Sequence, residues 1–324
     1  MKKIHVDKEI LNPNSQIQLF GYEKYFLSLE KLFKKKSLPN CIMISGIKGI
    51  GKATFIYHFI NRILSIKENK HYDINNFKIN SENASYNLLR EKIHPNFHQI
   101  DYDPLDKNIK INQIRNLIKF NNKTTYLDNL KINLIDNAEN LNLNSSNALL
   151  KAIEEPNPNT FFFLIHNSAK KILNTVRSRC LEFKISFNFE EKSNIFKTLM
   201  NQYSFDLQKA YIDNYFHYES PGNLLKYINF FEKSNIKLTP DILNNIIFLI
   251  KHCERDKSFD SLEMLSFFIE KFYHQLCMNN SKDFLFYSNK NSLLTYKINE
   301  LKKFNLNIKN TLNIITDTVL NEKR

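Results

Sequence analysis

A glycine-rich loop with a lysine near its end is the first group of residues that could do chemistry. It consists of Gly46, Ile47, Lys48, Gly49, Ile50, Gly51, Lys52, Ala53 and Thr54. The loop lies between a short apolar run at 41–45 and a helical pattern of apolar residues at 55–64. Glycines let backbone N–H groups close around phosphate oxygens, and a lysine at this position can reach the outer phosphates. The pattern therefore predicts a phosphate-binding loop for a nucleotide such as ATP.

One position of this loop departs from the usual pattern. The residue after the lysine is normally Ser or Thr, whose hydroxyl binds Mg²⁺, and here it is Ala53. Thr54 comes one residue later and points about 100° further round the helix. The loop thus lacks a well-placed hydroxyl for Mg²⁺. Two interpretations stay open: the loop binds a nucleotide, or it keeps only the shape of a nucleotide-binding loop.

The second candidate is an acid that ends the apolar run at 132–135. Asp136 is expected at the carboxyl end of a buried strand, where open α/β sheets place their ligands, and it could orient Mg²⁺. The next residue is Asn137, and an amide cannot accept a proton as a general base. We therefore do not expect the chain to hydrolyse a bound nucleotide by itself.

The third candidate is Arg179, in the run Ser178-Arg179-Cys180 just before a short strand expected at 181–185. An arginine beyond the start of this strand can lie on a face that a neighbouring molecule reaches. Alternatively, it can tie the strand to its own domain through an ion pair. The run alone does not decide between these two interpretations.

The pattern of apolar residues predicts the elements that carry these candidates. Short strands are expected at 41–45, 97–101, 132–135, 161–165 and 181–185, and helical patterns alternate with them up to about residue 185. Continuous apolar runs such as 161–165 are typical of parallel strands buried on both faces. Beyond this point the pattern is helical throughout. The predicted fold class is α/β followed by all-α, with domains at 1–185, 186–237 and 238–324. Residues 1–20 are expected to be a loose lead-in, 67–92 a helical or irregular insertion and 278–290 a loop.

The composition is that of a globular protein with an excess of positive charge. The 324 residues include 46 Lys and Arg against 33 Asp and Glu, a formal net charge of +13. This charge favours a polyanionic partner such as DNA, but the basic residues are spread along the chain, so compositional drift is an equal alternative. No apolar run has the length of a membrane span, and four isolated cysteines fit a reducing cytoplasm.

Four motifs occur together in order, and with them the chain resembles bacterial clamp-loader subunits of the AAA+ family. The first two are the loop at 46–54 and the run Leu134-Ile135-Asp136-Asn137-Ala138-Glu139. The third runs from Asn147-Ala148-Leu149-Leu150-Lys151 to Glu154-Glu155-Pro156, and the fourth is Ser178-Arg179-Cys180. The resemblance covers residues 15–235 well. It implies a P-loop sheet domain, a small helical lid and a helical collar through which subunits form a ring.

The resemblance also implies roles for the candidate residues. Arg179 corresponds to an arginine finger given to the ATP of a neighbouring subunit, whereas Asn137 replaces the glutamate that activates water in hydrolysing relatives. Gly222 falls near the position of a sensing arginine. The implied partners are other clamp-loader subunits in a hetero-pentamer, and through them a sliding clamp and primed DNA in the replisome at the nucleoid. The alternative is a motor subunit that hydrolyses ATP itself. Since no cysteine lies between Cys41 and Cys180, the zinc module of many relatives is not expected.

Overall fold

The computed structural model describes residues 12–102, 108–123, 130–203, 219–234, 239–255, 259–304 and 308–321. These residues form two compact units. The first holds the described residues of 12–203 together with 219–226, and the second holds the described residues from 227 onward. The predicted division into three domains stays a prediction.

A parallel sheet organises the first unit. Its strands are β1 (Cys41–Gly46), β2 (Phe97–Ile100), β3 (Lys131–Ile135), β4 (Thr160–Asn167) and β5 (Leu181–Lys184). They are arranged in the order β2-β3-β4-β1-β5, and every pair is parallel. All five strands were expected from the sequence. β1 lies between β4 and β5, and the loop that follows it stands at the carboxyl edge of the sheet.

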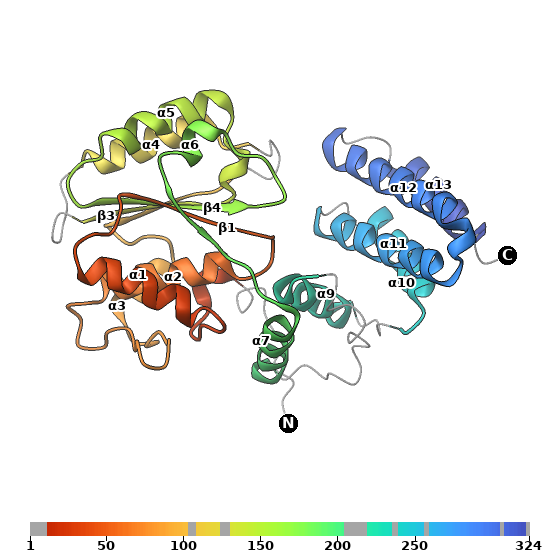
Figure 1. Ribbon diagram of the computed structural model, residues 1–324, viewed down its shortest axis with the longest axis horizontal. Helices are drawn as coiled ribbons and strands as arrows, with labels where there is room; N and C mark the ends of the chain where they lie inside the picture. The colour runs from red at the N-terminus through yellow and green to blue at the C-terminus, as the bar shows by residue number, and fades with distance from the viewer. Residues whose placement is uncertain are drawn as a thin grey trace. The chain divides into compact units, whose positions relative to one another are not determined.

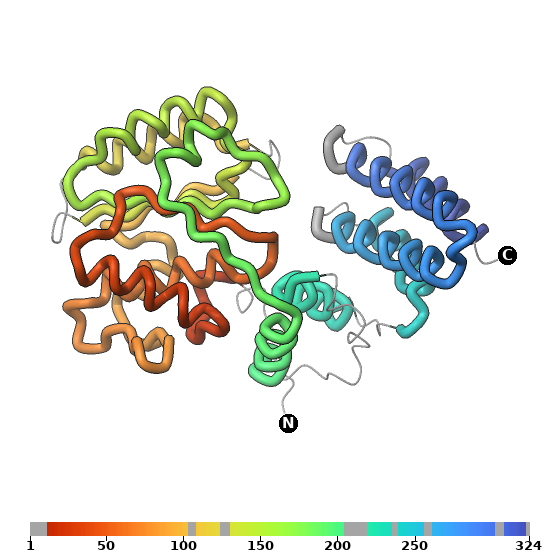
Figure 2. The backbone as a smooth tube through the Cα atoms, in the orientation of Figure 1, coloured from red at the N-terminus to blue at the C-terminus, as the bar shows by residue number. Residues whose placement is uncertain are grey.

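Helices cover both faces of this sheet (Figure 1). One face carries α1 (Glu23–Lys34), α2 (Lys52–Leu64) and α3 (Ala84–Arg90), and the other carries α4 (Ile111–Asn121), α5 (Leu143–Glu154) and α6 (Asn174–Arg177). The backbone trace shows the same three layers (Figure 2). Ile42 and Ile44 of β1 belong to one core, and Cys41 and Met43 belong to the other, as the two-residue period of a strand requires. The sheet is therefore buried on both faces.

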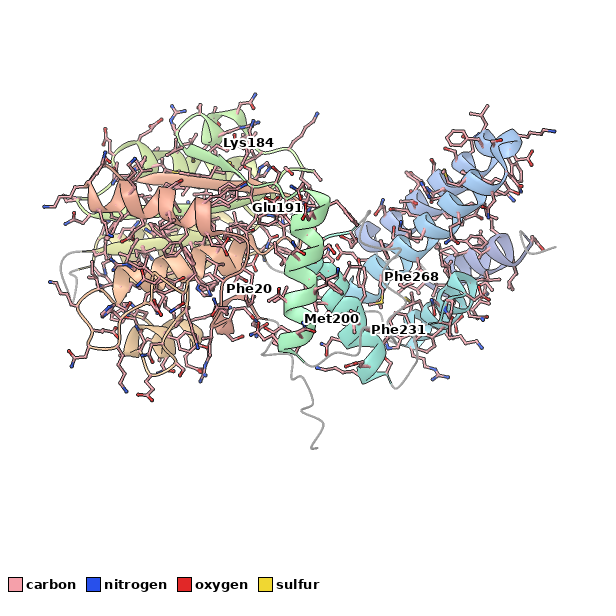
Figure 3. All side chains as sticks on the ribbon, turned by 60° about the horizontal axis from the view of Figure 1, so that its bottom comes forward. Phe20, Lys184, Glu191, Met200, Phe231 and Phe268 are labelled. Atoms are coloured by element: carbon pink, nitrogen blue, oxygen red, sulfur yellow. The ribbon has the colours of Figure 1, made fainter. Side chains whose placement is uncertain are left out.

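Helices make up the rest of the described chain. In the first unit, α7 (Phe189–Gln202) follows the sheet, and α9 (Pro221–Lys233) begins there. The second unit contains α10 (Ile242–Arg255), α11 (Phe259–Asn279), α12 (Phe284–Phe304) and α13 (Ile308–Asn321). Phe231 and Phe268 pack there with their ring centroids 5.9 Å apart (Figure 3). The predicted fold class, α/β followed by all-α, is confirmed.

Two local predictions were wrong. The stretch 278–290 is largely helical, because α11 continues to Asn279 and α12 begins at Phe284. Its apolar side chains are exposed, among them Leu285, so they give no amphipathic period that marks a helix. Within the lead-in, Leu19 is buried, and its backbone N–H donates to the carbonyl of Phe77, so this part of 1–20 is packed. Residues 1–11 lie outside the described ranges.

A search of the described helices for a segment long and apolar enough to cross a membrane finds none.

Candidate functional site

The glycine-rich loop connects the end of β1 to the start of α2. Gly49 and Gly51 have φ angles of +81° and +93°, in the left-handed region that side chains disfavour. The first turn of α2 starts directly at Lys52, with Gly51 as its N-cap. The loop therefore has the glycine-dependent backbone and the helix N-terminus that a phosphate cradle requires.

The Lys52 ammonium group is folded back onto the loop. Its Nζ donates to the carbonyl oxygens of Gly46, at 2.8 Å, and of Ile47, at 2.6 Å. Burial lowers the pKa of Lys52 to about 8, although the negative charges of Asp136 and Glu139 act in the opposite direction. A phosphate bound in the loop would add negative charge beside this buried ammonium group.

Asp136 follows the last residue of β3 and interacts electrostatically with Lys52. Burial and the nearby Asp101 carboxylate raise the pKa of Asp136 to about 6, against the backbone N–H of Asn137 and the charge of Lys52, which lower it. That N–H donates to Asp136 Oδ1 at 2.8 Å. The structure thus brings the loop lysine and this strand acid together at the carboxyl edge of the sheet.

Asp101, which follows β2, is a site residue that sequence reasoning missed. Asn137 Nδ2 donates to Asp101 Oδ1 at 2.9 Å, so the amide at the position of the missing base is paired with a carboxylate from the neighbouring strand. The rule that identified Asp136, an acid directly after a predicted strand, applies equally to Asp101. The site therefore pairs an acid that follows β2 with an amide that follows β3.

This pairing predicts what happens when a base is introduced. Asn137→Glu places a second carboxylate beside Asp101, so we expect it to lower stability by about 1 kcal/mol or more. The introduced group should have a raised pKa, so the loss is full at pH 8 and relieved as the pH falls through that pKa. Adding Asp101→Asn should recover the stability, which thermal unfolding at pH 8 and pH 5 measures. Equal losses for the single and double variants would contradict this pairing.

The loop also contacts the start of α9 within the first unit. The backbone N–H of Gly222 donates to the carbonyl oxygen of Gly49 at 2.9 Å. A Cβ atom added at Gly222 would lie 2.5 Å from that same oxygen, and one added at Gly49 would lie 2.5 Å from Asn223 Oδ1. Two glycines thus meet backbone to backbone, a contact that we call the loop–lid seam. The seam occupies the place where the resemblance put a sensing arginine.

Tyr22 holds the other side of the loop and was also missed from the sequence. Its hydroxyl donates to the carbonyl oxygen of Ile50 at 2.9 Å, and its ring stacks on Phe55 with the centroids 4.8 Å apart. Nothing in a lone tyrosine ahead of a predicted helix marks such a contact. The loop is therefore held by α2, by α9 and by the residue before α1.

Arg179 lies in the turn between α6 and β5. Its Nε is 2.5 Å from Glu154 Oε1, and its Nη1 donates to the carbonyl oxygen of Thr175 at 3.0 Å. Glu154 is the last residue of α5, so the Glu-Glu-Pro motif contacts the Ser-Arg-Cys motif directly. The Arg179 side chain is nevertheless 38% exposed. Both interpretations from the sequence, an accessible arginine and an arginine in an ion pair, describe part of this arrangement.

Arg179 and the glycine-rich loop lie at opposite edges of the sheet. Ile42 near the start of β1 pairs with Leu181 of β5, so Arg179 stands beyond the amino end of both strands. The loop begins at Gly46, five residues after Cys41. These steps amount to about 16 Å of extended strand. Arg179 therefore belongs to a different surface from the one formed by Lys52 and Asp136.

The fold and site define a class of protein: a P-loop α/β domain, followed by helices, with an exposed arginine at the sheet edge away from the loop. The sequence model of the family described as DNA polymerase III, delta subunit, matches residues 21–188. This segment is just over half of the 324 residues. The chain belongs to this family.

Three relatives show how far the similarity extends. DNA polymerase III subunit delta' of Pseudomonas aeruginosa is 30% identical over 140 residues, 43% of this chain and 41% of that relative. The subunit delta' of Buchnera aphidicola subsp. Schizaphis graminum is 25% identical over 289 residues, 80% of this chain and 86% of the relative. The gamma subunit of the same organism is 28% identical over 179 residues, 55% of this chain and 47% of the relative. The chain thus spans less than half the length of two of these relatives.

Proposed function

We propose that this chain serves as a delta-prime-type subunit of a DNA polymerase III clamp loader. In this role it donates Arg179 to the ATP of a neighbouring subunit and does not hydrolyse ATP itself. The observation that carries this proposal is the position of Arg179, exposed and about 16 Å of strand away from the chain's own phosphate loop. A guanidinium group at that edge can serve only a phosphate held by another molecule.

The loop supports nucleotide binding without turnover. The backbone at 46–54 and the Lys52 ammonium group would hold the phosphates, and a bound nucleotide would supply the negative charge that the buried lysine favours. The groups that hydrolysis needs are incomplete, because Ala53 has no hydroxyl and the Asn137 amide is hydrogen-bonded to Asp101. Asp136 is an oxygen ligand that could orient Mg²⁺. No zinc site is part of the proposal.

The partners follow from the family. The proposed assembly is a hetero-pentamer with gamma- or tau-type and delta-type subunits, which opens a sliding clamp and places it on primed DNA. The formal net charge of +13 is compatible with an assembly that works on DNA. A gamma-type relative also matches, so the alternative of a motor subunit is tested directly below.

One experiment tests the assembly role and ATP turnover by this chain separately. The chain is mixed with gamma- and delta-type subunits, and the mixture is analysed by size exclusion with and without ATP. We expect one complex that contains all three kinds of subunit, and no ATP turnover by the isolated chain. Failure to enter the complex would overturn the assembly role. Turnover by the isolated chain that disappears in Lys52→Ala would favour the motor subunit.

The pKa of Lys52 makes nucleotide binding depend on pH. Phosphate oxygens favour the charged ammonium group, so binding raises the lysine pKa from about 8 and takes up a proton near that pH. We expect affinity to fall as the pH rises above 8, with proton uptake visible in calorimetry in two buffers of different ionisation enthalpy. Lys52→Ala should weaken binding roughly 10- to 100-fold and remove the proton uptake.

The matched control is Lys48→Ala, which removes an exposed lysine of the same loop. It should lower affinity only slightly and leave the proton uptake unchanged. If Lys48→Ala removes the uptake while Lys52→Ala keeps it, the lysine that meets the phosphates has been assigned wrongly.

A further inference from the structure

Two cysteines far apart in the sequence meet at the amino edge of the sheet. Cys41 is the first residue of β1, and Cys180 is the residue before β5. Because Ile42 pairs with Leu181, the two cysteines are the next neighbours toward the amino ends of paired parallel strands. Their sulfur atoms lie 2.7 Å apart.

The backbone geometry at this position suits a bond between the two sulfur atoms. Adjacent strands lie about 4.8 Å apart, within the range of about 4.4–6.8 Å that disulfides require between Cα atoms. Both side chains pack into the same hydrophobic core, on the face of the sheet covered by α4, α5 and α6. The two side chains therefore lie on the same face and adjacent, with no rearrangement of the strands needed.

The two thiols differ in their surroundings. Cys41 is buried, and Cys180 is partly accessible, with its Sγ also 3.3 Å from the carbonyl oxygen of Val176. The hydrogen bond with Cys180 and burial raise the pKa of the Cys41 thiol far above its ordinary value. Cys180 is therefore the thiol that an oxidant meets first, and Cys41 is the buried partner that resolves the oxidised product.

We propose that Cys41 and Cys180 form a reversible thiol–disulfide pair that closes when the chain meets a peroxide. The Cys180 thiol gives up its proton, its sulfur takes one oxygen of the peroxide to become a sulfenic acid as the O–O bond breaks, and the hydroxide that leaves takes up that proton to give the first water. The Cys41 sulfur then attacks the Cys180 sulfur, the new S–S bond forms and the S–O bond breaks. The departing hydroxide takes the Cys41 proton. In total, two thiols lose two hydrogens and the peroxide becomes two water molecules.

The consequence of this chemistry falls on the turn before β5. Arg179 is the residue directly before Cys180, and the backbone N–H of Cys180 donates to the carbonyl oxygen of Arg177 at 3.2 Å. A disulfide would fix this turn covalently to the first residue of β1. The pair is thus a modification site at the base of the exposed arginine, and it exists whether or not Arg179 serves a neighbour's ATP.

The test uses the intact folded chain and measures thiols. The reduced chain is treated briefly with hydrogen peroxide, denatured and alkylated, and its tryptic peptides are weighed. We expect two of the four thiols to be lost, a peptide pair joined through Cys41 and Cys180 that is lighter by two hydrogens, and recovery of both thiols with dithiothreitol. A native chain in which Cys180 becomes a sulfinic acid while Cys41 stays alkylatable would overturn the pair.

Two variants sharpen the result. Cys277→Ser removes the other partly accessible cysteine and should leave the linked peptides and the loss of two thiols unchanged. Cys180→Ser, a substitution of similar size, should abolish the linkage and leave Cys41 as a thiol. If Cys180→Ser loses as many thiols as the native chain, the reaction occurs elsewhere and the pair is wrong. Since the native chain gives the linked peptide by itself, a poorly folded variant does not remove the test.

Discussion

Arg179→Ala is expected to reduce ATP hydrolysis at the neighbouring site of a reconstituted clamp loader by about 10³-fold or more. The guanidinium group neutralises charge that develops on the transferred phosphate, and alanine offers nothing in its place. The chain's own fold should change little, because an exposed ion pair such as Arg179–Glu154 contributes about 1 kcal/mol at most. Single-turnover hydrolysis in the presence of primed DNA, with the neighbouring site alone active, measures the effect.

The surroundings of Arg179 supply matched controls. Arg177→Ala removes an exposed arginine of the same turn, which pairs with Glu182 at 2.8 Å, and it should leave hydrolysis unchanged. Glu154→Gln breaks the Arg179 ion pair but keeps the guanidinium group, so it should retain most of the rate. If Glu154→Gln and Arg179→Ala reduce the rate equally, the arginine acts through its own domain and the finger role is lost.

Gly222→Arg, which places an arginine where the sequence resemblance implies one in ATPase subunits, is expected to destabilise the first unit by about 1–3 kcal/mol. The cause is the Cβ atom and not the charge, because a Cβ at this position lies 2.5 Å from the backbone oxygen of Gly49. Gly222→Ala should therefore cost nearly as much. A loss of stability is unusual for this substitution, since replacing glycine by alanine within a helix normally stabilises the helix by up to about 1 kcal/mol. Urea unfolding monitored through the first unit measures both variants.

Lys226→Ala is the matched control for the seam variants, because it changes an exposed residue of the same helix without approaching the loop. It should alter stability by less than about 0.5 kcal/mol. If Gly222→Ala proves as stable as the native chain, α9 can move away from the loop without loss. The seam would then be a loose contact, and the loop would be free to close around phosphates in the manner of hydrolysing relatives.

Much of the fold could be predicted because local patterns determine it. The buried runs at 41–45 and 161–165 are continuous because both faces of the sheet are covered, and each became a strand. Asp136 could be placed at the carboxyl edge because it directly follows a predicted strand, and open parallel sheets bind ligands at the carboxyl ends of their strands. The loop at 46–54 could be recognised because φ angles above zero require glycine at Gly49 and Gly51.

The relations between segments could not be predicted in the same way. The Gly222–Gly49 bond, the Asn137–Asp101 pair and the contact of Cys41 with Cys180 join residues 36 to 173 positions apart, as the numbering shows. No local period carries such information. The prediction of a loop at 278–290 was wrong for a local reason. The apolar residues at the start of α12 are exposed, so its first turns have no buried apolar stripe that would mark a helix. The buried face of α12 shows in the sequence only from Leu294 and Ile298 onward.

Because the loop and Arg179 lie at opposite sheet edges, the chain has two unlike contact surfaces, one with the phosphate loop and one with the arginine. A contact that seats the arginine of one molecule against the phosphates of the next joins unlike surfaces, so it cannot be reciprocated by a two-fold axis through the same contact. Successive subunits must all face the same way round. In a ring left open to admit DNA, one end then presents an arginine with no recipient, and the other presents a nucleotide with no donor.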